Sequence, residues 1–479
     1  AYEAEAASAN HWSLYVPNGG SYQYEEESKN FFRYYLEHPE IKVINNSWGA
    51  NLYTDKVKID ESVYQGLSDM IHARQEYGFS QVIAAAKQDK LLVFCAGNDG
   101  HASPEMEALL GYWDSSARSN ILTVTALDGF TTRSSGMIAA TQQNSGVMSC
   151  FSNLSQYVED STLAASGYLI LSANANYAAD GSLDVLDSGS SMAAPFVTGT
   201  GALVQQAFPY LSAKQIGDVL LSTANSKLEY SRGYVAQLQR EDTGWQLNFF
   251  VLDPQLKSLS KEELLEKYHT YLANCVSDSW VEKTRIRSKI AEEENLVNIY
   301  EDVSLQELIG QGVVDAGAAV CGPGAFNARR LNASDISGSY TINGTSQQQA
   351  LYRVDTQGYD SVWSNDIKEI KAGYIASDST EADLRARWKY YDTNWLSYTG
   401  TDDRTAATAT TNYMMNLYNQ QVTDSGLAGL HVGLCKAGAG TLALTGTNTY
   451  EGSSIAAGGT LEIDGSVAGD AWSITDSSA

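Results

Sequence analysis

The stretch that most constrains how this chain can fold spans residues 187–207 and reads DSGSSMAAPFVTGTGALVQQA. Gly189 permits a tight turn, and Ser190 and Ser191 are favourable N-cap residues. Pro195 suits a first helical turn, where its missing N–H costs nothing. We therefore expect a helix that begins at or near Ser191. Its body is small and apolar nearly all round, which is typical of a buried helix, and a serine at the positive end of such a helix is well placed for nucleophilic attack.

Two earlier stretches read as buried strands that end in small or polar residues. Residues 43–49 read VINNSWG, and residues 91–100 read LLVFCAGNDG, whose turn presents Asn98. Each stretch alone could be a plain core element, and the serine stretch alone could be a capped core helix. Together with GSSMAAP at 189–195, they resemble three motifs of the subtilisin-like serine proteases, the subtilases. Three motifs in this order are specific, and the resemblance extends from about residue 1 to residue 325.

The resemblance implies a catalytic pair. Ser191 corresponds to the nucleophile, which attacks the peptide carbonyl and becomes acylated. Asn98 corresponds to a donor of the oxyanion hole, where its side-chain amide joins the backbone N–H of Ser191 on the tetrahedral intermediate. The function implied is that of a serine endopeptidase, with polypeptides as its substrates.

The resemblance also implies where a substrate binds. The edge that pairs with the substrate backbone as an added strand corresponds to Ser47, Trp48 and Gly49. Ala96 and Gly97 correspond to one wall of the pocket for the residue before the cut. Trp48 stands where an aliphatic residue is commoner in the family, which leaves the shape of this pocket open.

A subtilase also needs an Asp and a His, and both precede the serine in the chain. No His-Gly-Thr occurs here, and the six histidines suit other roles. His101 is near the site in sequence, but the family geometry puts its loop on the wrong side of Ser191. The opening AYEAEAASA resembles the segment that follows the catalytic-histidine helix, so we expect both residues to lie in a segment upstream of Ala1. Without that segment the chain should be inert or nearly so.

A pseudoprotease is the alternative interpretation. In that case the fold would serve as an adhesion or binding module at the cell surface, and the natural gene would lack the Asp and the His upstream as well.

Short buried strands alternate with helical stretches along the first half of the chain. We expect helices at 22–38, 74–89 and 212–224 and strands at 41–46, 91–96 and 121–126. This alternation predicts an α/β fold, a parallel sheet with helices on both faces, which is also the subtilisin-like architecture.

The expected domain organisation has four parts. Residues 1–225 form the catalytic core, and residues 226–310 form an insertion with a hairpin at 233–252 and a helix capped by Ser260 and Glu263. Residues 311–326 resemble the closing segment of a subtilase domain. Residues 327–479 are rich in Ser, Thr, Gly and β-formers and form a β-rich stem.

A weak repeat marks the end of the stem. GTLALTG at 440–446 recurs as GTLEIDG at 459–465, a spacing of nineteen residues. Such spacing favours stacked rungs of a parallel β-helix, with a low-complexity linker as the alternative. The repeat resembles the passenger repeat of Gram-negative autotransporters. The resemblance implies a secreted or cell-surface protein, with an outer-membrane translocator barrel as partner in the full-length protein.

Charge and cysteine content exclude several other classes. With 31 Lys and Arg against 57 Asp and Glu, the net charge is −26, which disfavours nucleic acid and anionic membranes as partners. Five widely spaced cysteines without a C-x-x-C indicate neither a zinc site nor a disulfide framework, and a single Cys275–Cys321 bridge is left open. We expect no cofactor. Calcium commonly stabilises the family, but no oxygen-ligand loop with suitable spacing is found.

Overall fold

The structure is a computed structural model. It describes residues 32–49, 79–227, 234–252, 259–266, 297–370 and 431–473, with short gaps inside several of these ranges.

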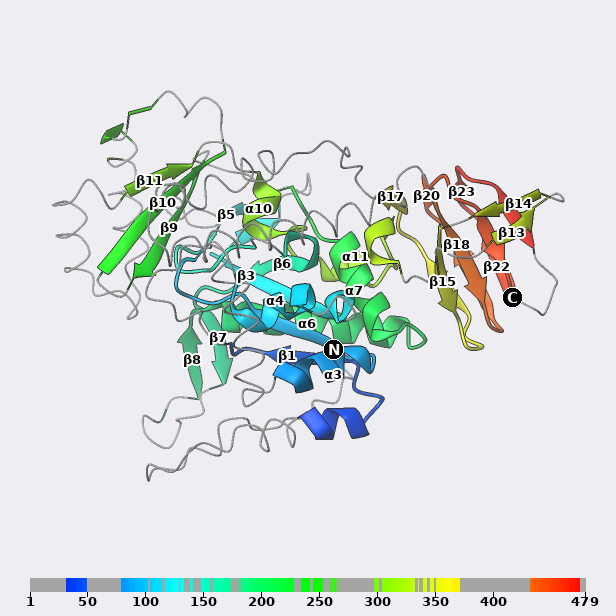
Figure 1. Ribbon diagram of the computed structural model, residues 1–479, viewed down its shortest axis with the longest axis horizontal. Coiled ribbons are helices and arrows are strands. Elements are labelled where there is room, and N and C mark those ends of the chain that lie inside the picture. Colours follow the sequence, from blue (N-terminus) through cyan, green and yellow to red (C-terminus); the bar gives the residue numbers. More distant parts are fainter. Residues whose placement is uncertain are drawn as a thin grey trace, which may run out of the picture.

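A four-stranded parallel sheet forms the centre of the molecule (Figure 1). Its order is β1 (Val43–Asn46), β2 (Leu91–Cys95), β3 (Ile121–Leu127) and β6 (Thr162–Ser166). Every neighbouring pair in it is parallel. The strands at 41–46, 91–96 and 121–126 are thereby confirmed, and β6 is an addition that its Thr and Ala content did not predict.

Helices cover both faces of this sheet, because successive side chains of a strand point to opposite faces. Leu91, Val93 and Cys95 pack with α6 (Ser190–Ala207) and α7 (Ala213–Ser222). Leu92 and Phe94 pack with α3 (Phe79–Lys87) and α4 (Met106–Trp113) in a separate cluster. The continuous burial of β2 and β3 follows from this double cover. The predicted α/β architecture is confirmed.

The insertion begins with the predicted hairpin. β9 (Tyr234–Glu241) and β10 (Gly244–Val251) are antiparallel and pair Gly244 with Glu241. β11 (Val297–Tyr300) lies parallel to β10. The Ser260 N–H donates to Glu263 Oε2 at 2.8 Å and the Glu263 N–H donates to Ser260 Oγ at 3.3 Å, as the capping box predicted. Residues 267–296 lie outside the described part of the chain.

The closing segment completes the sheet beside β6. Val313 bridges Ala164 in parallel and Asn225 in antiparallel orientation. It is flanked by α10 (Leu305–Ile309), which has a Ser304/Glu307 capping box, and α11 (Ala316–Ala319), which is capped by Asp315.

Smaller elements complete the catalytic part and the start of the stem. The 3₁₀ turns are Arg118–Asn120, Glu159–Ser161 and Ala328–Arg330. The hairpins are β4 (Phe130–Thr132) with β5 (Ile138–Ala140), β7 (Ile170–Ala173) with β8 (Asp184–Asp187), and β13 (Ser339–Ile342) with β14 (Thr345–Gln348).

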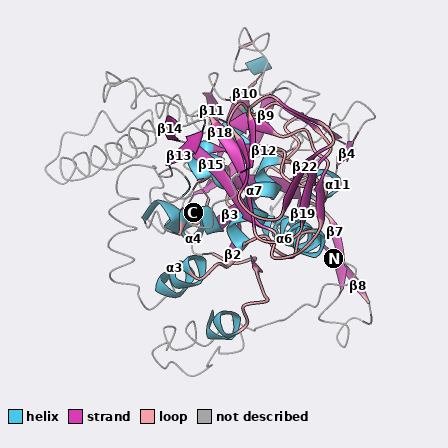
Figure 2. Ribbon diagram, turned by 90° about the vertical axis from the view of Figure 1, so that its right-hand side faces the viewer, coloured by secondary structure: helices cyan, strands magenta, loops and turns pink. Residues whose placement is uncertain are grey.

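From β15 (Ala350–Asp355) onward, the described strands of the stem are parallel to their neighbours and stack turn upon turn (Figure 2). One sheet holds β15, β18 (Val432–Ala437), β21 (Ser454–Ala456) and β24 (Ala471–Ser473). A second holds β16 (Ser361–Trp363), β19 (Thr441–Leu444) and β22 (Thr460–Ile463), and a third holds β20 (Thr447–Asn448) and β23 (Ser466–Val467). Thr441 pairs with Thr460, so the nineteen-residue repeat of the sequence is one rung of this stack.

The α/β part, expected to be the catalytic core, and the stem share one hydrophobic core. β12 (Ala325–Asn327) pairs in parallel with β17 (Lys368–Ile370), across the boundary predicted after residue 326. Phe326 stacks on Tyr352 of the stem with ring centroids 5.0 Å apart. The stem is therefore packed directly onto α7 and its surroundings (Figure 1).

Among the described helices, none combines the length and the apolar character that crossing a bilayer requires. Within the described residues, Cys95, Cys150, Cys321 and Cys435 form no disulfide, and Cys275 lies outside that part of the chain.

Candidate active site

Helix α6 begins at Ser190, within one residue of the predicted start, but neither serine is its N-cap. The N-cap is Gly189, which has no side chain to offer. Asn98, in the loop after β2, supplies the missing acceptor instead, since its Oδ1 receives the Ser190 N–H at 2.8 Å. The N-terminus of α6 is thus capped by the Asn98 side chain from the loop after β2, and this bond fixes the position of Asn98.

Pro195 is the sixth residue of α6, and its missing N–H has a consequence that the sequence interpretation overlooked. In a regular helix the N–H of residue 195 would bond the carbonyl of Ser191. The Ser47 hydroxyl replaces it, donating to Ser191 O at 2.7 Å. The expectation that the proline costs nothing is therefore wrong: it leaves a carbonyl that the end of β1 must satisfy.

Ser191 is partly accessible to solvent, whereas its neighbour Ser190 is fully buried. Ser190 has no exposed surface, and its Oγ lies 3.0 Å from Gly97 N, Gly97 O and Asn98 Oδ1. Ser191 is half-buried, and its Oγ makes only long contacts, 3.4 Å to Ser47 O and 3.9 Å to Cys95 Sγ. Of the two adjacent hydroxyls, only that of Ser191 is free to meet a substrate.

Cys95 lies beside Ser191 but does not compete with it as a nucleophile. The thiol is buried, and burial together with the nearby Glu105 carboxyl raises its pKa far above the ordinary value. A thiol held neutral in this way is a poor nucleophile.

Two hydrogen-bond donors lie at the N-terminus of α6, close to the Ser191 hydroxyl. The Ser190 N–H can only donate, so its bond to Asn98 fixes which end of that amide is oxygen and leaves Nδ2 as the donor. Nδ2 lies next to Gly189, 3.3 Å from where a Cβ on that glycine would be. The Ser191 N–H meets no acceptor among the described residues. Two such donors beside a hydroxyl are what a tetrahedral oxyanion requires.

Asn153 holds the loop that carries Asn98, and sequence reasoning missed it. Its Oδ1 accepts the N–H groups of Asp99 at 3.1 Å and His101 at 2.9 Å. Its amide also fills the space beside Gly97, whose φ of +108° suits glycine. A single Asn in a loop carries no sequence signal of such a role. The backbone of His101 is fixed from the same segment, since its carbonyl accepts the Leu154 N–H.

The two predicted substrate edges lie on either side of one acidic side chain. Gly49 is exposed at the end of β1, while Trp48 packs into the sheet against Phe94, with ring centroids 5.6 Å apart. Ala96 is buried, and its carbonyl accepts the Glu105 N–H at 2.9 Å. The Glu105 carboxyl then fills the space next to both Gly49 and Gly97. Sequence reasoning did not single out Glu105.

Comparison with models of known protein families shows to which family this chain belongs. The model of the subtilase family, Peptidase_S8, matches residues 6–245, half of the chain. The chain belongs to the subtilase family. A second model, the passenger-associated-transport-repeat, matches residues 434–463, from β18 to β22.

Two curated proteins share sequence with this subtilase. An extracellular serine protease of Serratia marcescens is 25% identical over 472 residues, 90% of this chain and 33% of that protein. The serotype-specific antigen 1 of Mannheimia haemolytica is 27% identical over 200 residues, 38% of this chain and 18% of that protein. The chain thus spans a third or less of the length of these relatives.

Solved structures with partial similarity include two proteases. A cold-adapted subtilisin-like serine proteinase is 22% identical, with 45% of this chain and 60% of that chain covered and a TM-score of 0.29. The prenylagaramide maturation protease PagA is 19% identical, with 42% and 57% covered and a TM-score of 0.28.

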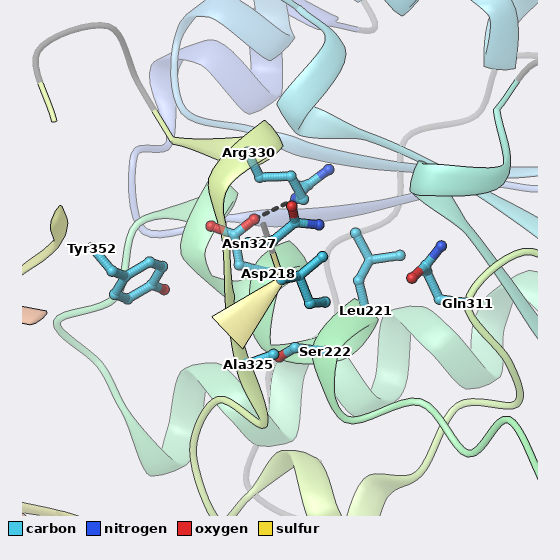
Figure 3. A pocket seen from close by; sticks show the side chains of 9 residues that line it. Asp218, Leu221, Ser222, Gln311, Ala325, Asn327, Arg330 and Tyr352 are labelled. Atoms are coloured by element: carbon cyan, nitrogen blue, oxygen red, sulfur yellow. Dashed lines mark hydrogen bonds and ion pairs between the residues drawn. The ribbon is translucent and has the colours of Figure 1, made fainter. Parts of the chain in front are cut away.

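A small pocket of this subtilase lies at the junction with the stem (Figure 3), and neither Ser191 nor Asn98 is among the residues that line it. Asp218 of α7 and Arg330 form an ion pair at its edge, and Tyr352 of the stem lies on its other side. Its position and its ion pair mark it as a structural joint.

Among the described residues, one group could offer several atoms to a metal ion. Glu369, His431 and Glu451 bring their ligand atoms within 4.8 Å of one another in the stem. Hydrogen bonds already occupy the Glu369 carboxylate, which accepts the Val432 N–H at 2.9 Å and lies 3.2 Å from His431 Nδ1. We interpret the group as a hydrogen-bonded link between β17 and the start of β18.

Proposed function

We propose that this subtilase is the catalytic part of a serine endopeptidase that hydrolyses peptide bonds through an acyl-enzyme on Ser191. The observation that carries the proposal is the different accessibility of two adjacent serines at the N-terminus of α6. Ser190 is sealed and Ser191 is accessible, with the Asn98 amide nitrogen beside the helix end.

The reaction follows from this geometry. Ser191 Oγ attacks the substrate carbonyl carbon and gives its proton to a histidine base. The negative charge that forms on the carbonyl oxygen is held by Asn98 Nδ2 and the Ser191 N–H. The amine leaves with the proton from the histidine, and a water molecule then hydrolyses the ester by the same route and restores the Ser191 hydroxyl.

The histidine and its aspartate are proposed to come from a segment that precedes Ala1. The motif His-Gly-Thr does not occur in the 479 residues. Of the histidines that the structure describes, His38 lies 2.7 Å from Glu40 and His431 belongs to the stem. The printed chain alone should therefore be inert or nearly so.

Peptide hydrolysis by the longer protein, with its upstream segment, tests the proposal. We expect Ser191→Ala to abolish cleavage, whereas Asn98→Ala should lower kcat roughly 10²–10³-fold, the loss seen when a subtilisin loses one oxyanion donor. Retained cleavage by Ser191→Ala would overturn the assignment of the nucleophile.

Export by autotransport is proposed from the stem. The transport-repeat match covers the stacked rungs β18–β22, which suggests a secreted or cell-surface protein. An outer-membrane translocator barrel would be the partner in the full-length protein. Deleting residues 434–463 from the full-length protein should cause the passenger to accumulate in the periplasm, as fractionation would show; unchanged surface display would contradict this role.

A pseudoprotease that binds or adheres at the cell surface is the second candidate. The observation that favours it is the absence of the His-Gly-Thr motif from the printed sequence. Reading the open reading frame upstream separates the two candidates, because a natural gene without the Asp and the His would favour the pseudoprotease.

A further inference from the structure

Glu105 is a half-buried acidic residue that the proposed reaction does not use. It lies just before α4, where its backbone N–H is bonded to Ala96 O at 2.9 Å. Its Oε2 is inaccessible to solvent and has no hydrogen-bond partner among the described residues. Within the part of the chain that the structure describes, Glu105 therefore holds a buried carboxyl oxygen without a partner, at the edge of the proposed active site.

Other buried carboxylates of the described chain are satisfied. Asp218 pairs with Lys214 at 2.8 Å and with Arg330, and Asp128 accepts the Ser149 hydroxyl at 2.8 Å. A buried carboxyl oxygen that lacks a hydrogen-bond donor is unfavourable, so Oε2 of Glu105, next to the proposed nucleophile, points to a ligand that supplies the missing donor.

The position of the carboxyl specifies where that ligand would lie. A Cβ on Gly97 would approach Glu105 Oε1 to 2.9 Å, and a Cβ on Gly49 would overlap Oε2. Gly49 ends the edge predicted to pair with the substrate backbone, and Gly97 belongs to the predicted wall of the pocket. The carboxyl thus lies between the two segments that would flank the substrate residue before the cut.

The surrounding charges specify what kind of ligand fits. Glu107 on α4 and Asp99 in the loop after β2 are the carboxylates that act on Glu105, and the neighbouring Cys95 thiol is neutral. An acidic substrate side chain would be repelled by Glu107 and Asp99, and an apolar one would leave Oε2 of Glu105 without a hydrogen-bond donor. A lysine or arginine would supply the missing donor.

We propose that Glu105 forms the floor of the pocket for the substrate residue before the scissile bond and selects a lysine or arginine there. This inference rests on the proposed function, because it assigns a substrate class to the site of Ser191.

The state of Glu105 makes the selection dependent on pH. Burial, and then the charges of Glu107 and Asp99, raise the pKa of Glu105 to about 8. The carboxyl of the free protein is therefore largely protonated at neutral pH, and a cationic side chain must displace that proton. Affinity for such a side chain should fall as pH drops below 8, by up to about tenfold per unit.

Matched peptides that differ only in this residue test the proposal. The longer protein is assayed on fluorogenic peptides with arginine, the isosteric but neutral citrulline, or norleucine before the cut. We expect kcat/KM for arginine to exceed that for citrulline and norleucine at least tenfold, and roughly a hundredfold at pH 8 and above. Equal cleavage of the three peptides would overturn the proposal.

Two variants separate the pocket from the general charge of the region. Glu105→Gln keeps the shape of the side chain and should reduce the arginine preference to about one. Glu107→Gln should keep the preference and move its pH midpoint below 8. If Glu105→Gln retained the full arginine preference, Glu105 would not be the selecting group. Thermal unfolding of both variants controls for folding.

Binding measurements separate this inference from the proposed function, because they need no catalysis. The 479-residue chain is titrated by isothermal calorimetry with product-like peptides that end in arginine or citrulline. Stronger binding of the arginine peptide that is lost in Glu105→Gln supports the pocket even if the longer protein hydrolyses nothing. Hydrolysis that prefers the norleucine peptide would contradict the proposed role of Glu105 but would still support the peptidase function.

Discussion

At the scale of single residues, the proposed nucleophile Ser191 is held by a compensation between three positions. Pro195 removes the N–H that would bond Ser191 O, and the Ser47 hydroxyl takes its place at 2.7 Å. The same contact fastens the end of β1 to the first turn of α6. The geometry of the nucleophile therefore depends on a residue 144 positions earlier in the chain.

Removing this hydroxyl tests the compensation. Ser47→Ala should lower the free energy of unfolding by about 1–3 kcal/mol, because Ser191 O would be left without a donor. Adding Pro195→Ala should recover most of that loss, since residue 195 would then supply the intrahelical N–H. Urea unfolding of the two single variants and the double variant measures both effects; purely additive losses would contradict the compensation.

The sequence revealed some of these residues and concealed others. Ser191 and Asn98 lie in contiguous motifs, so their types and spacing were sufficient to single them out as candidates. Asn153 and Glu105 act through contacts that only the folded chain creates, because each sits in a loop brought to the site by the sheet. The burial of Ser190 was likewise not predictable, since two adjacent serines look alike in a sequence.

At the scale of elements, the joint between the catalytic part and the stem centres on a buried ion-pair network. Asp218 of α7 meets Lys214 and Arg330, and Arg330 also donates to Ser119 O at 2.8 Å. Burial alone would raise the pKa of Asp218, but the two cations outweigh it and lower that pKa. The carboxylate is therefore charged in the folded protein.

Arg330→Met should destabilise the fold by about 3–5 kcal/mol, because it leaves a buried carboxylate only partly paired. Arg33→Met is the control: it removes an exposed pair with Glu37, so its effect should stay within about 1 kcal/mol. Denaturant unfolding measures both variants. Equal effects would contradict the role of the network.

The same network predicts a pH dependence. Because the pKa of Asp218 is lower in the folded than in the unfolded state, its stabilisation is fully present above the unfolded value of about 3.9 and is lost as pH falls further. The stability difference between wild type and Arg330→Met should therefore shrink in acid. A difference that stayed constant between pH 7 and pH 3 would exclude this charge as its source.

Lys436 links successive rungs of the stem. It is fully buried, and its ammonium donates to Gly438 O at 2.7 Å and Gly458 O at 2.9 Å. Lys436→Met should lower the free energy of unfolding by about 2–3 kcal/mol, because both carbonyls lose a charged donor. The exposed Lys368→Met should be close to neutral. Circular dichroism during urea unfolding tests this pair, and a neutral Lys436→Met would contradict the link.

Elements with a strong pattern were predictable, and those with small residues were not. The apolar runs of β2 and β3 were sufficient to predict those two strands. The nineteen-residue repeat likewise predicted the stacked strands at the end of the stem. β6 reads TLAAS, and it is buried because α6 packs closely against it rather than because its residues favour strands. Pairing β12 with β17 needed contacts between distant segments, which no local pattern encodes.

At the scale of the whole molecule, the stem and the catalytic part form one continuous core. Leu91 of the central sheet, Phe326 at the joint and Leu442 of the stem belong to the same hydrophobic cluster. The rungs therefore support α7, which packs on α6 and on the strand that precedes Asn98. We therefore expect substitutions that destabilise the stem to lower the stability of α7 as well.

Labelling with a fluorophosphonate, followed by mapping of the modified residue, is the most direct test of the central assignment. In the longer protein with its upstream segment, the label should attach to Ser191, remain in Ser190→Ala and disappear in Ser191→Ala. A label on Ser190, or none on Ser191, would contradict the account.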